Sequence, residues 1–142
     1  MTKAQKIALL LLRLTLGGLF LYAGVSKILD STWTAAGFLA GAKTFPELYA
    51  WFALPENLGW VNLTNEWGLT LLGISLIIGL WVRWTALGGI VLMALYYFPS
   101  LQFPYAGEHG FIVDEHLIYS AGLLVLSVFR GGRYFGLDGR GR

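Results

Sequence analysis

The chain has no cysteine among its 142 residues. It therefore has no disulfide, no thiol redox chemistry and no thiolate to ligate an iron–sulfur cluster or another metal. Histidine is scarce too, with two residues, and only His116 falls in an apolar segment. A haem held by two histidines is therefore not expected. Any redox role must use a bound small molecule or a partner protein.

Charged residues are also few, at 13% of the chain, whereas 56% of the residues are hydrophobic and the mean hydropathy is +0.64. Four long apolar segments cover residues 7–29, 62–82, 84–101 and 114–129. A hydrocarbon core of about 30 Å requires roughly 20 apolar residues per helix. Four spans and their connections therefore use the whole chain. We expect a single all-α domain over residues 1–142, an integral membrane four-helix bundle.

Charge is divided unevenly between the ends of these segments. One set of ends is mainly basic and carries Lys3, Lys6, Arg83, Arg130, Arg133, Arg140 and Arg142. The opposite ends collect Asp30, Glu47, Glu56, Glu108, Asp114 and Glu115. Because short loops rich in lysine and arginine stay cytoplasmic, both termini are expected to be cytoplasmic. This orientation accounts for the net charge of +2 without nucleic-acid binding.

The longest connection runs from Asp30 to Trp60 and contains Pro46 and Pro55, so it is too interrupted to span a membrane. It is rich in aromatic residues and poor in charge, which is typical of a segment in the membrane interface. We expect one or two short amphipathic helices there, which cap the outer end of the bundle. An aromatic belt without further function is the alternative.

Five residues of the first segment follow one another at spacings of four, three, four and three: Arg13, Gly17, Phe20, Gly24 and Lys27. Residues at such spacings share one face of a helix. Glycines on that face predict close contact with another helix. Arg13 is about 9 Å inside the helix start. Its side chain either extends to the inner membrane surface or has a buried partner, such as Asp138 or a polar group of the second segment.

Ionisable residues from three segments are expected at a similar depth. Helical rise places Lys27, Glu66, Glu115 and His116 in the outer third of the membrane. An ionisable group near the bilayer centre costs roughly 2.5–3.5 kcal/mol on insertion scales, so such groups pair or line a wet cavity. Lys27 with Glu66 or Glu115 is the expected pair. The sequence predicts a polar pocket under the aromatic connection; the alternative is that these residues only mark helix ends and pair for packing.

Such a pocket would hold a quinone head group or another small polar ligand. His116 would donate to a quinone carbonyl or transfer protons, and Glu66 or Glu115 would supply or accept the accompanying protons. A metal site is not expected, because the histidines and carboxylates of residues 108–116 match no standard ligand spacing.

Several short motifs, in their order and spacing, resemble the DoxX family of small four-helix membrane proteins. The opening motif comprises Leu12-Arg13-Leu14, Gly17, Phe20, Ala23-Gly24 and Lys27. Further motifs are similar to the DoxD-like branch, named after the large subunit of thiosulfate:quinone oxidoreductase. These are residues 33–39, Asn65-Glu66-Trp67-Gly68, Gly73, Gly79, Arg83, residues 113–119 and residues 132–138.

The resemblance implies a multi-pass protein of the prokaryotic plasma membrane. In that branch it also implies electron transfer from thiosulfate to membrane quinone, giving tetrathionate. The expected catalytic residues are His116, Glu66 and Glu115. The expected ligand-binding residues are Lys27, Trp33, Asp114, Tyr119 and Arg13.

The expected cofactor is a quinone, and the expected partners are membrane lipid, a second oxidoreductase subunit and a further copy of the chain. Two other functions remain open at this point. One is a non-enzymatic scaffold that anchors a partner enzyme in the membrane. The other is a carrier for a small molecule or an ion.

Overall fold

The computed structural model describes residues 1–140 and is mostly helical. Its helices are α1 (Lys3–Leu29), α2 (Ala36–Ala40), α3 (Pro46–Phe52), α4 (Pro55–Ile78), α5 (Val82–Ser100) and α6 (Glu115–Val128). Two 3-10 helices, η1 (Gly131–Arg133) and η2 (Leu137–Gly139), follow α6. The remaining elements are three short strands, β1 (Leu101–Gln102), β2 (Tyr105–Ala106) and β3 (Gly110–Phe111).

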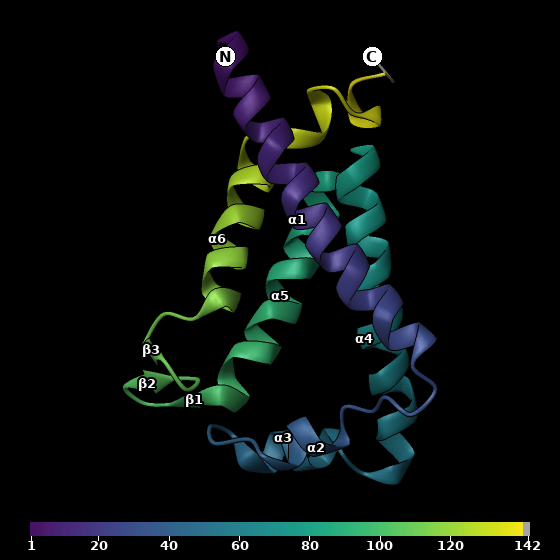
Figure 1. The fold of residues 1–142 in the computed structure, drawn as a ribbon, viewed down its shortest axis with the longest axis vertical. Helices are drawn as coiled ribbons and strands as arrows, with labels where there is room; N and C mark the ends of the chain where they lie inside the picture. Colours follow the sequence, from purple (N-terminus) through teal and green to yellow (C-terminus); the bar gives the residue numbers. More distant parts are fainter. Residues whose placement is uncertain (141–142) are drawn as a thin grey trace.

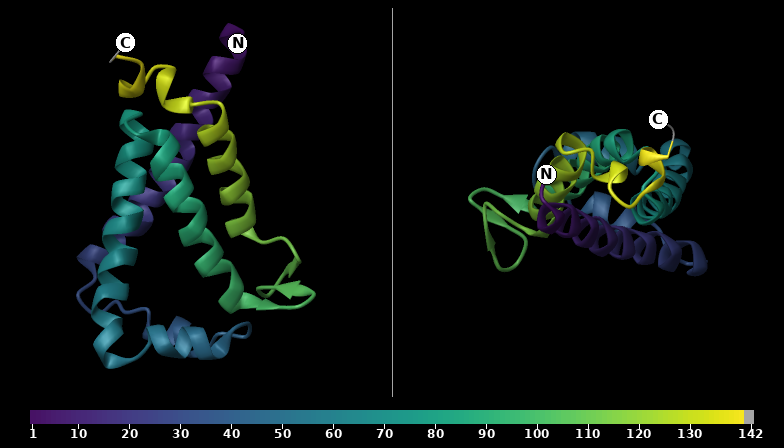
Figure 2. Two further views of the ribbon diagram at one scale, coloured as in Figure 1. Left: turned by 180° about the vertical axis from the view of Figure 1, so that it is seen from behind. Right: turned by 90° about the horizontal axis from the view of Figure 1, so that it is seen from above.

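The four longer helices pack against one another (Figure 1). Helix α1 contacts α4 and α6, and helix α5 also contacts α4 and α6. The start of the chain and the segment after α6 lie at one end of the molecule, while α2 and α3 lie across the opposite end. The three strands project sideways at that same opposite end (Figure 2).

Two helices of residues 1–140 are long and apolar enough to cross a membrane, by length and composition. These are α1, with a hydropathy of 1.9, and α4, with a hydropathy of 1.2. Helix α6 is apolar but has only 14 residues, a length of about 21 Å at the rise of an α-helix. Helix α5 has 19 residues, but polar and aromatic residues at both ends lower its hydropathy. Of the four expected spans, α1 and α4 are therefore long and apolar enough to cross a membrane.

The long connection forms two short helices, α2 and α3, as the sequence predicted. Its expected end near residue 60 is wrong, because α4 already begins at Pro55. Proline lacks an N–H group, and the first turn of a helix has no internal acceptor for one, so proline is favoured at that position. Pro55 therefore starts the helix instead of interrupting it.

The strands lie within residues 101–111, in the connection between α5 and α6. This segment forms a small antiparallel sheet in the order β1-β2-β3, in which Leu101 pairs with Ala106 and Tyr105 with Phe111. The Tyr97 hydroxyl donates to the carbonyl of Ile112 and so attaches the end of the sheet to α5.

The predicted glycine face of α1 is confirmed as a close helix contact. Gly17 and Gly24 are buried on that face. A methyl group on Gly24 would overlap Thr70 of α4, and one on Gly73 would overlap the backbone of Leu21. Because neither helix has a side chain at these points, the backbones of α1 and α4 can approach closely.

A second apolar cluster lies under the short helices, apart from the main core. Its buried members are Ala35, Leu39, Tyr49 and Val61. The main core instead joins α1, α4, α5 and α6 around Phe20, Leu76, Ala86 and Leu123. Since the second cluster joins the connection to α4, it fixes α2 and α3 over one end of the bundle.

Candidate functional site

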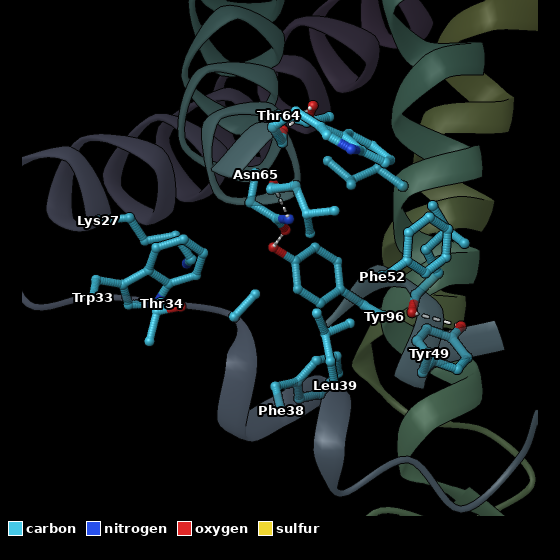
Figure 3. Close-up of a pocket in the computed structure, with 15 residues that line it drawn as sticks. Lys27, Trp33, Thr34, Phe38, Leu39, Tyr49, Phe52, Thr64, Asn65 and Tyr96 are labelled. Atoms are coloured by element: carbon cyan, nitrogen blue, oxygen red, sulfur yellow. Dashed lines mark hydrogen bonds between the residues drawn. The ribbon is translucent and has the colours of Figure 1, made fainter. Parts of the chain in front are cut away.

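A cavity of about 250 Å³ lies between α4, α5 and the connection that carries α2 and α3 (Figure 3). Most of its wall is aromatic or aliphatic. Its polar lining residues are Lys27, Thr34, Tyr49, Thr64, Asn65 and Tyr96. A mainly apolar wall with a few placed polar groups is typical of sites for small organic ligands.

Lys27 enters the cavity from the last turn of α1. Its Nζ donates to the Ala23 carbonyl at 3.1 Å and lies 5.4 Å from the ring centroid of Trp33, which also lines the cavity. An ammonium group over an indole ring is held by a cation–π interaction. Since an ammonium has three N–H donors, and Ala23 takes one, Lys27 keeps donors for a ligand.

Two side chains of α4 and α3 attach the connection to the long helices. The Asn62 amide accepts from the Ala35 N–H at 2.9 Å and donates to the Thr34 hydroxyl at 3.2 Å. The Tyr49 hydroxyl donates to the Leu95 carbonyl at 2.9 Å. Burial raises the pKa of Tyr49, so its hydroxyl stays protonated as this donor.

Tyr96 of α5 faces the cavity and is fixed by contacts on several sides. Its hydroxyl donates to Asn65 Oδ1 of α4, and its ring packs 5.8 Å from that of Phe38. The imidazole of His116 stacks on the same ring, with centroids 5.5 Å apart and planes at 12°. Tyr96 therefore connects the cavity wall to the start of α6.

The structure brings together three of the predicted site residues at the start of α6. His116 Nδ1 lies 2.8 Å from Asp114 Oδ2, and the His116 ring lies 6.3 Å from that of Tyr119. Asp114 also caps α6, because its Oδ1 accepts from the N–H groups of His116 and Leu117. His116 does not line the cavity; it contacts it through Tyr96.

The expected pairing of Lys27 with Glu66 or Glu115 is wrong. Glu115 is exposed, Glu66 is half-buried, and neither lines the cavity. Among residues 1–140 neither forms an ion pair with Lys27. Of the four residues expected to share a pocket, only Lys27 lines it. Helical rise determines the depth of a residue, whereas the rotation of each helix about its axis decides where the side chain points.

Arg13 lies far from the cavity, at the end of the molecule that holds both described chain ends. Its side chain is 1% exposed, so extension to the membrane surface is ruled out in favour of a buried position. Its guanidinium donates to the carbonyls of Gly131, Tyr134 and Phe135. The expected partner Asp138 lies near enough to attract Arg13 electrostatically but, in the described part of the chain, forms no direct ion pair with it; its carboxylate accepts from the N–H groups of Trp81 and Val82.

Sequence reasoning did not select Tyr96 and Asn65, although both line the cavity. Tyr96 lies near the end of the apolar segment 84–101 without a motif around it, and Asn65 appears only in a family motif. Asn65 carried a usable signal, because an amide within an apolar segment needs a hydrogen-bond partner. Nothing local in the sequence identified Tyr96 as that partner, since the two residues lie on different helices.

The structure combines two helices that are long and apolar enough to cross a membrane with a cavity whose wall is mainly aromatic and aliphatic. The sequence profile of the DoxX family matches residues 8–99, more than half of the chain. The protein therefore belongs to the DoxX family, which is membrane-associated. The match supports the family as a whole and does not single out its thiosulfate:quinone oxidoreductase branch. Neither a curated protein nor a solved structure matches the chain.

Proposed function

We propose that the protein is the quinone-binding membrane subunit of an oxidoreductase and that the cavity holds the quinone ring. The observation that carries this proposal is the composition of the cavity wall. Aromatic side chains such as Trp33 and Phe38 suit a flat apolar ring, and the Lys27 ammonium supplies a hydrogen-bond donor for a ring oxygen. A volume of about 250 Å³ suits a single substituted ring.

The proposed setting is a four-helix membrane bundle formed by α1, α4, α5 and α6, with both termini in the cytoplasm of a prokaryotic cell. Support comes from the charge distribution, since the chain ends that lie together carry the basic residues. Helices α2 and α3 then lie in the outer interface. The cavity opens beside them, at a depth where a lipid-soluble quinone can enter from the outer leaflet.

The proposed reaction is the transfer of electrons from thiosulfate to quinone. Two thiosulfate ions join through a new S–S bond to give tetrathionate and release two electrons. The quinone takes up these two electrons and two protons to give hydroquinone. Because this chain has no cysteine, we assign thiosulfate oxidation to a second subunit and quinone reduction to this one.

The test is to fill the cavity. Leu92 lines it, whereas the neighbouring Val91 on α5 is 62% exposed and faces away from the core. The two variants Leu92→Trp and Val91→Trp, purified in lipid nanodiscs, are compared for co-purified quinone by mass spectrometry. We expect Leu92→Trp to lose bound quinone at least tenfold and Val91→Trp to keep it.

The same two variants separate the alternative functions. A scaffold would retain its partner enzyme in both variants and would bind no quinone in either. A carrier would show a flux across proteoliposomes that Leu92→Trp abolishes. If the unmodified protein neither co-purifies with quinone nor binds added duroquinone, the proposed function is wrong.

A further inference from the structure

The Tyr96 hydroxyl donates its proton to another residue of the protein, Asn65, and therefore cannot donate it to a ligand. Asn65 Nδ2 donates to the Val61 carbonyl at 2.8 Å. A carbonyl oxygen can only accept a hydrogen bond, so the NH₂ group of Asn65 must point to Val61 and its Oδ1 to Tyr96. Oδ1 also can only accept, and the Tyr96 hydroxyl must therefore be the donor in their contact.

On this side of the cavity the Tyr96 hydroxyl faces a ligand as an acceptor, because its proton is bound to Asn65 Oδ1. Asn65 Nδ2 retains a second N–H, but this nitrogen lies on the edge of the amide that faces Val61 and not on the edge that faces Tyr96. After donating its proton, Tyr96 Oη retains lone-pair capacity, and Asn65 Oδ1 retains a second lone pair. The other hydroxyl protons nearby are also engaged, because Tyr49 donates to the Leu95 carbonyl and Thr64 to the Trp60 carbonyl. A ligand oxygen that hydrogen-bonds to Tyr96 must therefore belong to a hydroxyl group, which can act as the donor.

Lys27 lies on the other side of the cavity, beside Trp33 (Figure 3). One of its three N–H groups is bound to the Ala23 carbonyl, and the others remain as donors. The cavity therefore offers a cationic donor on one side and two acceptors on the other. A matching ring carries an oxygen with free lone pairs toward Lys27 and a hydroxyl group toward Tyr96.

We propose that the cavity selects the hydroquinone over the quinone, with Tyr96 and Asn65 as the residues that determine this selectivity. This inference rests on the proposed function. A quinone has two carbonyl oxygens that only accept, so one of them would meet the acceptors of Tyr96 and Asn65 without a proton between them. A hydroquinone hydroxyl donates to the same site.

This selectivity has a consequence for electron transfer. The bound quinone takes up two electrons and two protons, and the protein holds the product more tightly than the substrate. Tighter binding of the reduced form raises the reduction potential of the bound pair. A tenfold preference corresponds to about 30 mV for a two-electron couple. The site would therefore favour quinone reduction over hydroquinone oxidation.

The test compares three probes with one ring: duroquinone, durohydroquinone and the dimethyl ether of durohydroquinone. Binding to the full-length protein in nanodiscs is measured anaerobically by equilibrium dialysis. We expect durohydroquinone to bind about tenfold more tightly than duroquinone or the ether, which is the typical effect of one hydrogen bond at a buried site. This comparison requires no variant.

Two variants assign the preference to its residues. Tyr96→Phe removes one of the two acceptors and leaves Asn65 Oδ1, so the ratio of the two affinities should fall but still favour durohydroquinone. Asn65→Leu frees the Tyr96 proton, so Tyr96 becomes a donor and the preference should shift toward duroquinone. Tyr22→Phe is the control, because Tyr22 is 78% exposed on α1 and should leave the ratio unchanged.

The outcomes separate this inference from the proposed function. If duroquinone binds as tightly as durohydroquinone or more tightly, the selectivity is wrong and quinone binding stands. If none of the probes binds, both proposals are wrong. A preference of unchanged size in a folded Tyr96→Phe or Asn65→Leu protein also overturns the selectivity. Should one variant fail to fold, the other and the unmodified protein still decide.

Discussion

Arg13 Nη1 donates a 3.0 Å hydrogen bond to the carbonyl of Gly131, 118 positions later in the chain. Further bonds from the same guanidinium reach the carbonyls of Tyr134 and Phe135. Asp138, in the same segment, accepts from the first N–H groups of α5. One side chain of α1 and one carboxylate therefore fix the segment after α6 against the end of the bundle.

Replacing Arg13 should destabilise the protein strongly. Arg13→Met leaves the buried carbonyl of Gly131 and the partly buried carbonyls of Tyr134 and Phe135 without their donor. A hydrogen bond to a charged group contributes about 1.5–3 kcal/mol, and bonds from one guanidinium do not add in full. We expect a loss of about 2–4 kcal/mol in the free energy of unfolding, measured by thermal unfolding in detergent. The exposed residue Arg83 supplies the control. Equal stability of Arg13→Met and Arg83→Met would contradict the role assigned to Arg13.

Substitutions of two glycines of α1, Gly24 and Gly18, should have different effects on stability, because only Gly24 lies in the contact with α4. Gly24→Leu should destabilise the protein by about 1–3 kcal/mol or more, because the side chain would enter the backbone of α4. A Cβ on Gly18 meets nothing within 4 Å, so Gly18→Leu should be tolerated. Thermal unfolding of both variants in the same detergent measures the difference. Similar melting temperatures would show that the two helices do not approach closely in the membrane.

The arrangement of the chain in the membrane should follow its charges. Reporters fused after Lys6, or after Arg142, which lies outside the residues that the structure describes, should face the cytoplasm, because the basic residues gather at that end. A reporter inserted near Lys43 or Glu108 should face outward. Labelling of cysteines introduced at these sites with a membrane-impermeant reagent measures the sidedness, since the chain has no cysteine of its own. One terminus labelled from outside would rule out the four-span arrangement.

Lys27 and His116 should differ in their effect on ligand binding. Lys27→Met removes a charged donor from the cavity and should weaken duroquinone and durohydroquinone binding about tenfold or more. His116→Ala should have a smaller effect, because His116 contacts Tyr96 and not the cavity itself. The exposed Lys43→Met protein is the control, with binding measured by equilibrium dialysis. A larger effect of His116→Ala would place the histidine in direct contact with the ligand.

The sequence predicted those features that depend on neighbouring residues. Hydropathy located the long helices, and the aromatic content with Pro46 located the connection that forms α2 and α3. The spacing of Gly17 and Gly24 predicted the helix face that packs against α4. Each of these follows from the period of an α-helix or from the local effect of proline and glycine, so residues close in sequence suffice.

The site could be predicted only in part. The depth of Lys27 followed from helical rise, and Lys27 indeed lines a cavity under the aromatic connection. The prediction that Glu66 or Glu115 lies beside Lys27 was wrong, because the depth of a residue does not determine the rotation of its helix about the helix axis. Rotation is set by packing among α1, α4, α5 and α6, which no single segment specifies.

The sequence by itself therefore determined the class of protein, the helices and the chemical types of residue available. The tertiary structure alone decided which of them meet. It placed Tyr96 against Asn65 and made the tyrosine a donor, and it gave the buried Arg13 three carbonyls from the far end of the chain. Periodicity is a property of one helix, whereas these contacts join separate helices and depend on how their side chains interlock.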